Sequence, residues 1–400
     1  MADRLFKKWN KMQHKHKKIE SLILNFILML ASLIIALALA EVLLRFLKIG
    51  GNSFEHPRYL YRTSDTLGYE YTPNFNGIFK TDFNFNTKIK INSKGLRDYE
   101  YSYDKPSNVF RILVLGDSFT AGLQVQMEDT YPKVIERLLK NKNYGNYRYE
   151  VINSGVSGYN TIQEFEFLKE KGIKFKPDIV VIGFCMSNDI KDNYLGSLYT
   201  VIDGWLANRI KENTNYLFVN IKAFVRKYSR LYCFITNKIK ESLVLKKMLI
   251  KMNVVVPDLL PDKLSLYSKH MSEEVKKEWE FTGRILRDIK KFADDNSIKL
   301  LVVTIPDQFQ TEGFRWRLIM NQYKLIPEDY DIDNPQKTLI EICDKEDVMV
   351  LDLTEGLRKY ADKKERLYIE NEYHWNKYGH LCVAKEIYNF LNKQKNYFMY

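Results

Sequence analysis

Cysteine, proline and glycine are all scarce in this sequence of 400 residues. The four cysteines lie far apart and form no C-x-x-C pair, which argues against a zinc ribbon, a disulfide scaffold or a thioredoxin-type redox site. Ten prolines and eighteen glycines are too few for a collagen-like or low-complexity polymer, and 45% hydrophobic residues suffice for a substantial core. Clusters of His, Asp and Glu with metal-ligand spacing are also lacking, so we expect no metal and no other cofactor.

Most of the chain has no excess of basic residues. The formal net charge of +12 comes from two segments. Residues 1–20 contain seven basic and two acidic side chains, and residues 207–251 contain eleven basic and two acidic ones, so the rest of the chain is close to neutral. A protein that binds nucleic acid along its main body would carry basic residues over that body. We therefore expect no nucleic-acid partner.

One long uncharged run follows the first basic segment. Between Leu22 and Ala40, only Asn25 and Ser32 interrupt the apolar side chains. A helix of this length spans roughly 28 Å, which is close to the hydrocarbon thickness of a bilayer. The run predicts a transmembrane anchor, which we place over residues 21–47.

The flanking charges predict the orientation of this anchor. The basic tail, residues 1–20, is expected in the cytoplasm, and the rest of the chain is expected outside it, in the periplasm or at the cell surface. A cleavable signal peptide is the alternative, because Ala38-Leu39-Ala40 has the small-x-small form of a cleavage site. Both interpretations place the main part of the chain in an extracytoplasmic space.

Residues 50–108 are predicted to form a small β-rich appendage. Phe83, Phe85, Ile89 and Ile91 alternate with polar residues, which is typical of a half-buried strand.

From residue 109 onward, strands alternate with helices. The apolar strands are expected at residues 112–115, 149–152, 179–184, 300–305 and 348–353, and the helices at residues 129–140, 161–172, 272–297 and 376–394. Buried strands separated by helices indicate a three-layer α/β fold with a parallel sheet. The functional site of such a fold lies at the carboxyl ends of its strands.

Polar motifs occur where those strands end. Gly116-Asp117-Ser118 follows the first strand, the loop Asn153 to Gly158 follows the second, and Asn188-Asp189 follows the third. A further motif, His374-Trp375-Asn376-x-x-Gly379-His380, precedes the closing helix. A serine and a histidine brought together could form a nucleophile and its base, with amide donors beside them.

These motifs resemble those of the SGNH (GDSL) hydrolase superfamily, in the branch with an N-terminal membrane anchor. The similarity covers roughly residues 90–394 and includes the segment Asn92 to Asp98. It implies a flavodoxin-like catalytic domain, which we bound at residues 109–396. It also implies that Ser118 is the nucleophile, that His374 is the general base, and that an oxyanion hole is formed by the backbone N–H groups of Ser118 and Gly158 and the side-chain amide of Asn188. Gly116, Asp117, Asp189 and Asn376 support these motifs.

Two departures from the family pattern bear on the site. Met186 stands where a glycine usually precedes the third-block asparagine by two positions. The acid before the histidine is normally Asp, whereas the candidates here are Glu372 and Asn371. We favour Glu372, because a carboxylate stabilises the imidazolium that forms during the reaction.

The implied activity is that of a serine esterase acting on O-acyl or acetyl esters of envelope glycans or lipids through an acyl-serine intermediate. An O-acyltransferase would use the same site, with a sugar hydroxyl in place of water. A third hypothesis is a non-catalytic envelope protein that binds polysaccharide. The sequence indicates neither the acyl chain length nor the oligomeric state.

A predominantly helical insertion is expected at residues 190–270, and it contains the second basic segment. One interpretation is a solvated cap. The other is a lid in which residues such as Lys246, Lys247 and Lys251 contact anionic headgroups or an acidic glycan. His380 is expected to pack against or cap the closing helix.

Overall fold

The structure is a computed structural model. It describes residues 2–47, 49, 56–80, 86–141, 147–202, 204–208, 224–225, 228–241, 263–362, 365–369 and 372–398. The chain separates into two compact units, residues 1–54 with 212–257 and residues 55–211 with 258–400. Phe83, Phe85, Asn371 and the three insertion lysines named above lie outside the described residues.

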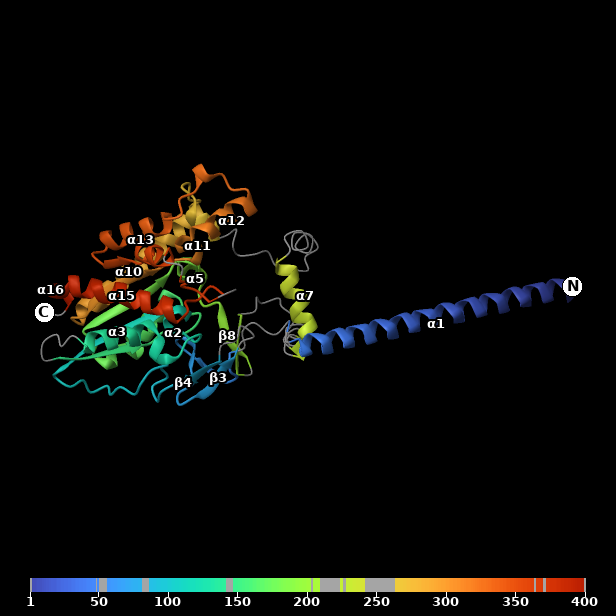
Figure 1. The fold of residues 1–400 in the computed structure, drawn as a ribbon, viewed down its shortest axis with the longest axis horizontal. Coiled ribbons are helices and arrows are strands. Elements are labelled where there is room, and N and C mark those ends of the chain that lie inside the picture. The colour runs from blue at the N-terminus through green and yellow to red at the C-terminus, as the bar shows by residue number, and fades with distance from the viewer. Residues whose placement is uncertain are drawn as a thin grey trace. The chain divides into compact units, whose positions relative to one another are not determined.

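The larger unit contains a five-stranded parallel sheet (Figure 1). Its strand order is β11-β10-β7-β5-β6, which is 5-4-3-1-2 in chain order. This is the flavodoxin-like order, and the predicted α/β fold is confirmed. The strands are β5 (Val109–Gly116), β6 (Arg148–Asn153), β7 (Ile179–Cys185), β10 (Lys299–Ile305) and β11 (Met349–Asp352).

The sheet is covered on both faces because its strands are apolar on both sides. Every residue of β5 and β7 is buried. One face packs against the amphipathic helix α3 (Tyr131–Lys140) and the closing helix α15 (Lys377–Lys393). Helices α4 (Thr161–Glu170) and α10 (Glu273–Asp295) contact β5 and β10 and complete the three layers.

Short helices and 3₁₀ turns connect these elements. The short α-helices are α2 (Ser118–Ala121), α5 (Asp189–Leu195), α11 (Gln308–Thr311), α12 (Gly313–Tyr323), α13 (Asn334–Lys345), α14 (Thr354–Ala361) and α16 (Lys395–Phe398). The 3₁₀ turns are η1 (Met127–Asp129), η2 (Gly172–Phe175), η3 (Ser265–Tyr267) and η4 (Pro327–Asp329).

The β-rich appendage consists of two antiparallel hairpins, β1 (Tyr61–Ser64) with β2 (Gly68–Tyr71) and β3 (Asn76–Lys80) with β4 (Asn86–Lys90). In β4, Thr87 and Ile89 are buried while their neighbours are exposed, which matches the alternation in the sequence. A third hairpin, β8 (Tyr199–Ile202) with β9 (Trp205–Asn208), occupies the start of the insertion that we expected to be helical. The described part of the insertion therefore combines strands with helices.

The smaller unit contains two described helices, α1 (Ala2–Phe46) and α7 (Arg230–Glu241). Within Lys18–Phe46 of α1, a stretch of 18 residues has a mean hydropathy of 2.8 and is not buried within the protein. By length and composition this helix could cross a membrane or act as a signal sequence.

Close packing between the turn after β5 and the loop after β6 gives a test of the fold. A Cβ atom added at Gly155 would lie 2.5 Å from the Ala121 nitrogen and 2.6 Å from the Thr120 Cβ. Gly155→Ala should therefore lower the free energy of unfolding by about 1–3 kcal/mol through overpacking. Thermal or denaturant unfolding measures this change.

Gly313→Ala is the matched control, because no atom lies within 4 Å of the added Cβ. Equal stability of the two variants would contradict the packing of the two loops.

Candidate active site

The candidate nucleophile lies in a tight turn between β5 and α2. Gly116 has a φ of +155°, and a Cβ there would collide with Thr120 Oγ1. The Asp117 carboxylate caps α2 by accepting a hydrogen bond from the Phe119 N–H at 2.9 Å. Ser118 is therefore the first residue of a short helix at the carboxyl end of β5. This is the topological switch point of the sheet, where β5 lies between β6 and β7.

The serine, histidine and glutamate predicted from the sequence lie together. His374 Nε2 is 2.7 Å from Ser118 Oγ, although 256 positions separate the two residues. The Glu372 Oε1 atom is hydrogen-bonded to His374 Nδ1, and Oε2 accepts the backbone N–H of His374 at 3.0 Å. His374 and Glu372 are each 6% exposed. A carboxylate, an imidazole and a hydroxyl thus form one continuous hydrogen-bonded chain.

The imidazole of His374 lies between two aromatic rings. The His374 ring centroid is 4.9 Å from that of Phe119 and 4.3 Å from that of Tyr373. Asn376 caps α15 by accepting the Gly379 N–H at 2.9 Å, and it donates to the Arg366 carbonyl at 2.7 Å. The loop that carries His374 is therefore tied to the start of the closing helix.

The proposed oxyanion-hole residues Gly158 and Asn188 lie in the loops that follow the two strands beside β5. Gly158 follows β6 with a φ of +79°, and a Cβ there would lie 2.8 Å from the Tyr199 ring and from the Tyr69 hydroxyl. Asn188 follows β7, and its Nδ2 donates to Asp117 Oδ2 at 3.1 Å. One N–H of this amide is thus held by the capping aspartate. The second can point toward a reacting oxygen.

Buried carboxyl groups lie beneath this turn. Burial raises the pKa of Asp117, Asp189 and Glu164, and each of these groups also interacts with another of the three. Asp189 Oδ2 accepts the Cys185 N–H at 2.7 Å, which fixes the end of β7. Both carboxyl oxygens of Glu164 are buried without a hydrogen-bond partner within the described residues. The sequence analysis did not identify Glu164, which resembles an ordinary surface residue of an amphipathic helix.

Arg97 stabilises the turn that carries Ser118. Its buried guanidinium donates to the carbonyls of Ala121, Gly122 and Val125 at 2.9, 2.8 and 2.6 Å. Burial lowers its pKa to about 10, so it stays charged at neutral pH. The segment containing Arg97 was noted for its resemblance, but its contact with α2 was not predicted.

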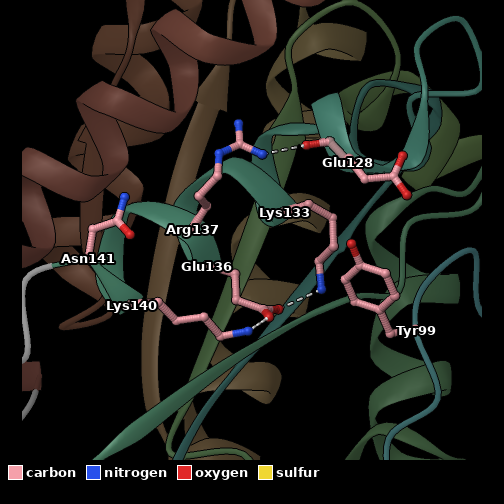
Figure 2. Close-up of a pocket in the computed structure, with 7 residues that line it drawn as sticks. All are labelled: Tyr99, Glu128, Lys133, Glu136, Arg137, Lys140 and Asn141. Carbon is pink, nitrogen blue, oxygen red and sulfur yellow. Dashed lines mark hydrogen bonds and ion pairs between the residues drawn. The ribbon is translucent and has the colours of Figure 1, made fainter.

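Asp98 connects the same segment to β6. Its Oδ2 accepts the Asn153 N–H at 2.6 Å, and its Oδ1 pairs with the Lys133 ammonium at 2.7 Å. Figure 2 shows Lys133 between the Glu136 carboxylate and the Tyr99 ring. Asn153 in turn donates to the Thr120 carbonyl at 2.9 Å. Arg97 and Asp98 therefore join the ends of α2 and β6, and we call this pair the Arg97–Asp98 clamp.

Two other histidines, the buried His380 and the half-buried His56, lie outside the hydrogen-bonded chain. His380 Nδ1 accepts the Tyr131 N–H at 3.3 Å, and its ring stacks on the Tyr131 ring. Burial lowers the pKa of His380 to about 3 and that of His56 to about 4. Both rings are neutral at physiological pH. His380 was expected to pack against or cap the closing helix; it lies within that helix, α15, and packs against Tyr131 of α3.

Comparison with known proteins relates part of the chain to one family. Residues 114–240 match the model of the GDSL-like Lipase/Acylhydrolase family. No curated protein sequence matches the chain. The matched segment contains Ser118, Gly158 and Asn188, and over these residues the chain is similar to a family of ester-acting hydrolases.

Several solved structures are similar to the chain at low identity. TesA is 12% identical with a TM-score of 0.39, and the alignment covers 71% of this chain and 98% of that one. The acetyl xylan esterase AlAXEase is 13% identical with a TM-score of 0.38, covering 70% and 100%. A lipase/acylhydrolase from Enterococcus faecalis is 14% identical with a TM-score of 0.38, covering 71% and 96%.

The Arg97–Asp98 clamp can be tested at Arg97. Arg97→Met leaves three carbonyl oxygens without their donor, and it should lower the free energy of unfolding by about 3 kcal/mol or more. Amide hydrogen exchange of residues 118–125 should accelerate more than that of β7.

Arg137→Met is the control, because Arg137 is exposed and donates to one carbonyl, that of Glu128, at 3.2 Å (Figure 2). Unchanged exchange in residues 118–125 of Arg97→Met would show that Arg97 does not hold the turn.

Proposed function

We propose that the chain is an extracytoplasmic serine esterase that cleaves O-acyl esters of envelope glycans or lipids. The hydrogen-bonded chain from Glu372 through His374 to Ser118 carries this proposal. A serine hydroxyl is a poor nucleophile unless a base within hydrogen-bond reach accepts its proton. At 2.7 Å from Ser118 Oγ, His374 Nε2 meets that condition.

The reaction begins with proton transfer from Ser118 Oγ to His374 Nε2, while Oγ attacks the ester carbonyl. The carbonyl oxygen becomes an oxyanion, and the N–H groups of Ser118 and Gly158 and the amide of Asn188 donate to it. A single preorganised donor of this kind contributes roughly 3–4 kcal/mol in transition-state stabilisation. Asn188 is preorganised because Asp117 holds its other amide hydrogen.

Collapse of the oxyanion expels the alcohol, which takes the proton from His374. An acyl group then remains on Ser118 Oγ. Water attacks this ester with His374 again acting as the base, and the acid product leaves. Glu372 stabilises the imidazolium in both halves of the reaction and holds the tautomer with a proton on Nδ1.

The extracytoplasmic location is supported by the apolar segment Lys18–Phe46 and by the basic residues that precede it. An enzyme anchored there meets the esters of the cell envelope. Transfer of the acyl group to a sugar hydroxyl would use the same acyl-serine. A purely binding role has less support, because a binding protein does not need a buried carboxylate aligned on an imidazole.

Covalent labelling tests the nucleophile. The full-length protein in detergent should react with a fluorophosphonate probe, and the adduct should map to Ser118 by peptide mass spectrometry. Ser118→Ala should abolish labelling. Ser187→Ala should retain it, because the Ser187 hydroxyl contacts Cys185 and Asn188 and no imidazole. An adduct on another serine, or none on the folded wild type, would refute the assignment.

The identity of the acid is tested by Glu372→Gln. The neutral amide cannot stabilise the imidazolium charge, so kcat for a short-chain nitrophenyl ester should fall by about 10³- to 10⁴-fold. Nitrophenol release at neutral pH measures this rate. Glu365→Gln, at an exposed position in the segment preceding the histidine, should be neutral. A near-normal rate for Glu372→Gln would show that Glu372 is not the acid that assists His374.

A further inference from the structure

The C-terminal part of α1 forms a cap for helix α7. The Glu41 carboxylate accepts the Arg230 N–H at 3.0 Å and the Leu231 N–H at 2.8 Å. Ser229 Oγ donates to the same carboxylate at 3.0 Å and accepts the Tyr232 N–H at 3.1 Å. The first three N–H groups of α7 are therefore all satisfied, two of them by a residue almost 190 positions earlier in the chain.

Arg45 strengthens this junction from one turn further along α1. Its Nε donates to Glu41 Oε1 at 2.8 Å, and its terminal nitrogen donates to the Tyr228 carbonyl at 2.5 Å. Anionic side chains stabilise helix N-termini, and a carboxylate in an apolar helix needs partners to offset its desolvation. Glu41 is the acidic residue that interrupts the apolar run, and its partners come from Arg45 and the start of α7.

The position of Glu41 along α1 determines where α7 begins. The uncharged run ends at Ala40 and is 19 residues long, which corresponds to roughly 28 Å of helix. This is close to the hydrocarbon thickness of about 30 Å, so the residues just beyond the run lie at the level of the headgroup layers. Glu41 and Arg45 lie within the next two turns of α1.

The exposed side chains of α7 and of the turn before it are suited to this layer. Phe224, Tyr228 and Ile235 are 64%, 52% and 45% exposed; Ile235 lies in α7, and the other two lie in the segment before it. Lys238, three residues beyond Ile235, is also exposed. Aromatic rings with basic residues are typical of interfacial helices, and the sequence from 207 to 251 has eleven basic residues against two acidic ones.

We propose that α7 is an interfacial helix that lies in the anionic headgroup layer of the membrane entered by α1, with Glu41 as the residue that holds it there. The proposal rests on the membrane anchoring assigned to α1 above. The partner of the exposed face of α7 is an anionic lipid surface. Binding is expected from apolar burial of Phe224, Tyr228 and Ile235 together with attraction of basic side chains to the lipid phosphates.

Site-directed spin labelling of the full chain in vesicles tests this placement. The native cysteines are all buried, so a single introduced cysteine can be labelled selectively. Three positions are labelled, each in a separate variant. Ile235→Cys reports on α7, Leu30→Cys reports on the middle of α1, and Glu274→Cys reports on an exposed position of α10 in the larger unit. Accessibility to oxygen and to a water-soluble nickel chelate is measured in phosphatidylcholine vesicles with and without phosphatidylglycerol.

The expected result is a label at residue 235 that is protected from the nickel chelate relative to the label at 274, with stronger protection when phosphatidylglycerol is present. Glu41→Ala should abolish that protection, bringing residue 235 to the level of residue 274. Glu20→Ala is the matched control, since Glu20 lies on the same helix and is paired with His16. Neither substitution should change the label at residue 30.

Three outcomes would overturn the proposal. If residue 30 reports hydrocarbon while residue 235 reports water, α1 spans the membrane and α7 is not interfacial. If residue 30 also reports water, the membrane anchoring itself is wrong. Equal protection of residue 235 in neutral and anionic vesicles would refute the anionic partner.

Discussion

The hydrogen bond between Ser118 and His374 is the contact on which the rest of the site depends. It joins the end of the first sheet strand to the loop before the last long helix, across 256 positions of sequence. No local propensity can produce it. It forms because β5 lies between β6 and β7 and α15 packs on the adjacent face of the sheet, so that the start of α15 reaches the carboxyl end of β5 (Figure 1).

The geometry proposed for the site also requires that the turn carrying Ser118 does not move. Helix α2 has only four residues, which is too short to be stable by itself. Its carbonyls are held by Arg97, and its neighbour β6 is held by Asp98. These charges are buried, so their removal leaves polar groups without partners in a region of low dielectric. The β-rich appendage therefore supplies structural support to the hydrolase domain from a separate part of the sequence.

Sequence reasoning recovered the sheet, its helices and the polar groups at the strand ends, because buried strands and caps depend on nearby residues. The end of β5 at Gly116 and the cap at Asn376 are examples. It did not recover contacts that depend on tertiary packing. The Arg97–Asp98 clamp looks like turn chemistry in the sequence, and Glu164 looks like a surface acid of α4 although it is 1% exposed. The β8–β9 hairpin lies in a segment whose aromatic and basic composition suggested helices.

The glutamate that replaces the usual aspartate has a geometric consequence. Its longer side chain folds back so that one oxygen meets the His374 ring and the other meets the backbone N–H of the same residue. The carboxylate therefore fixes the imidazole and the main chain together, over two residues. An aspartate at this position would be one methylene shorter and would have to move its backbone to make both contacts. Glu372 thus places its charge at Nδ1 and constrains the loop through the His374 N–H as well.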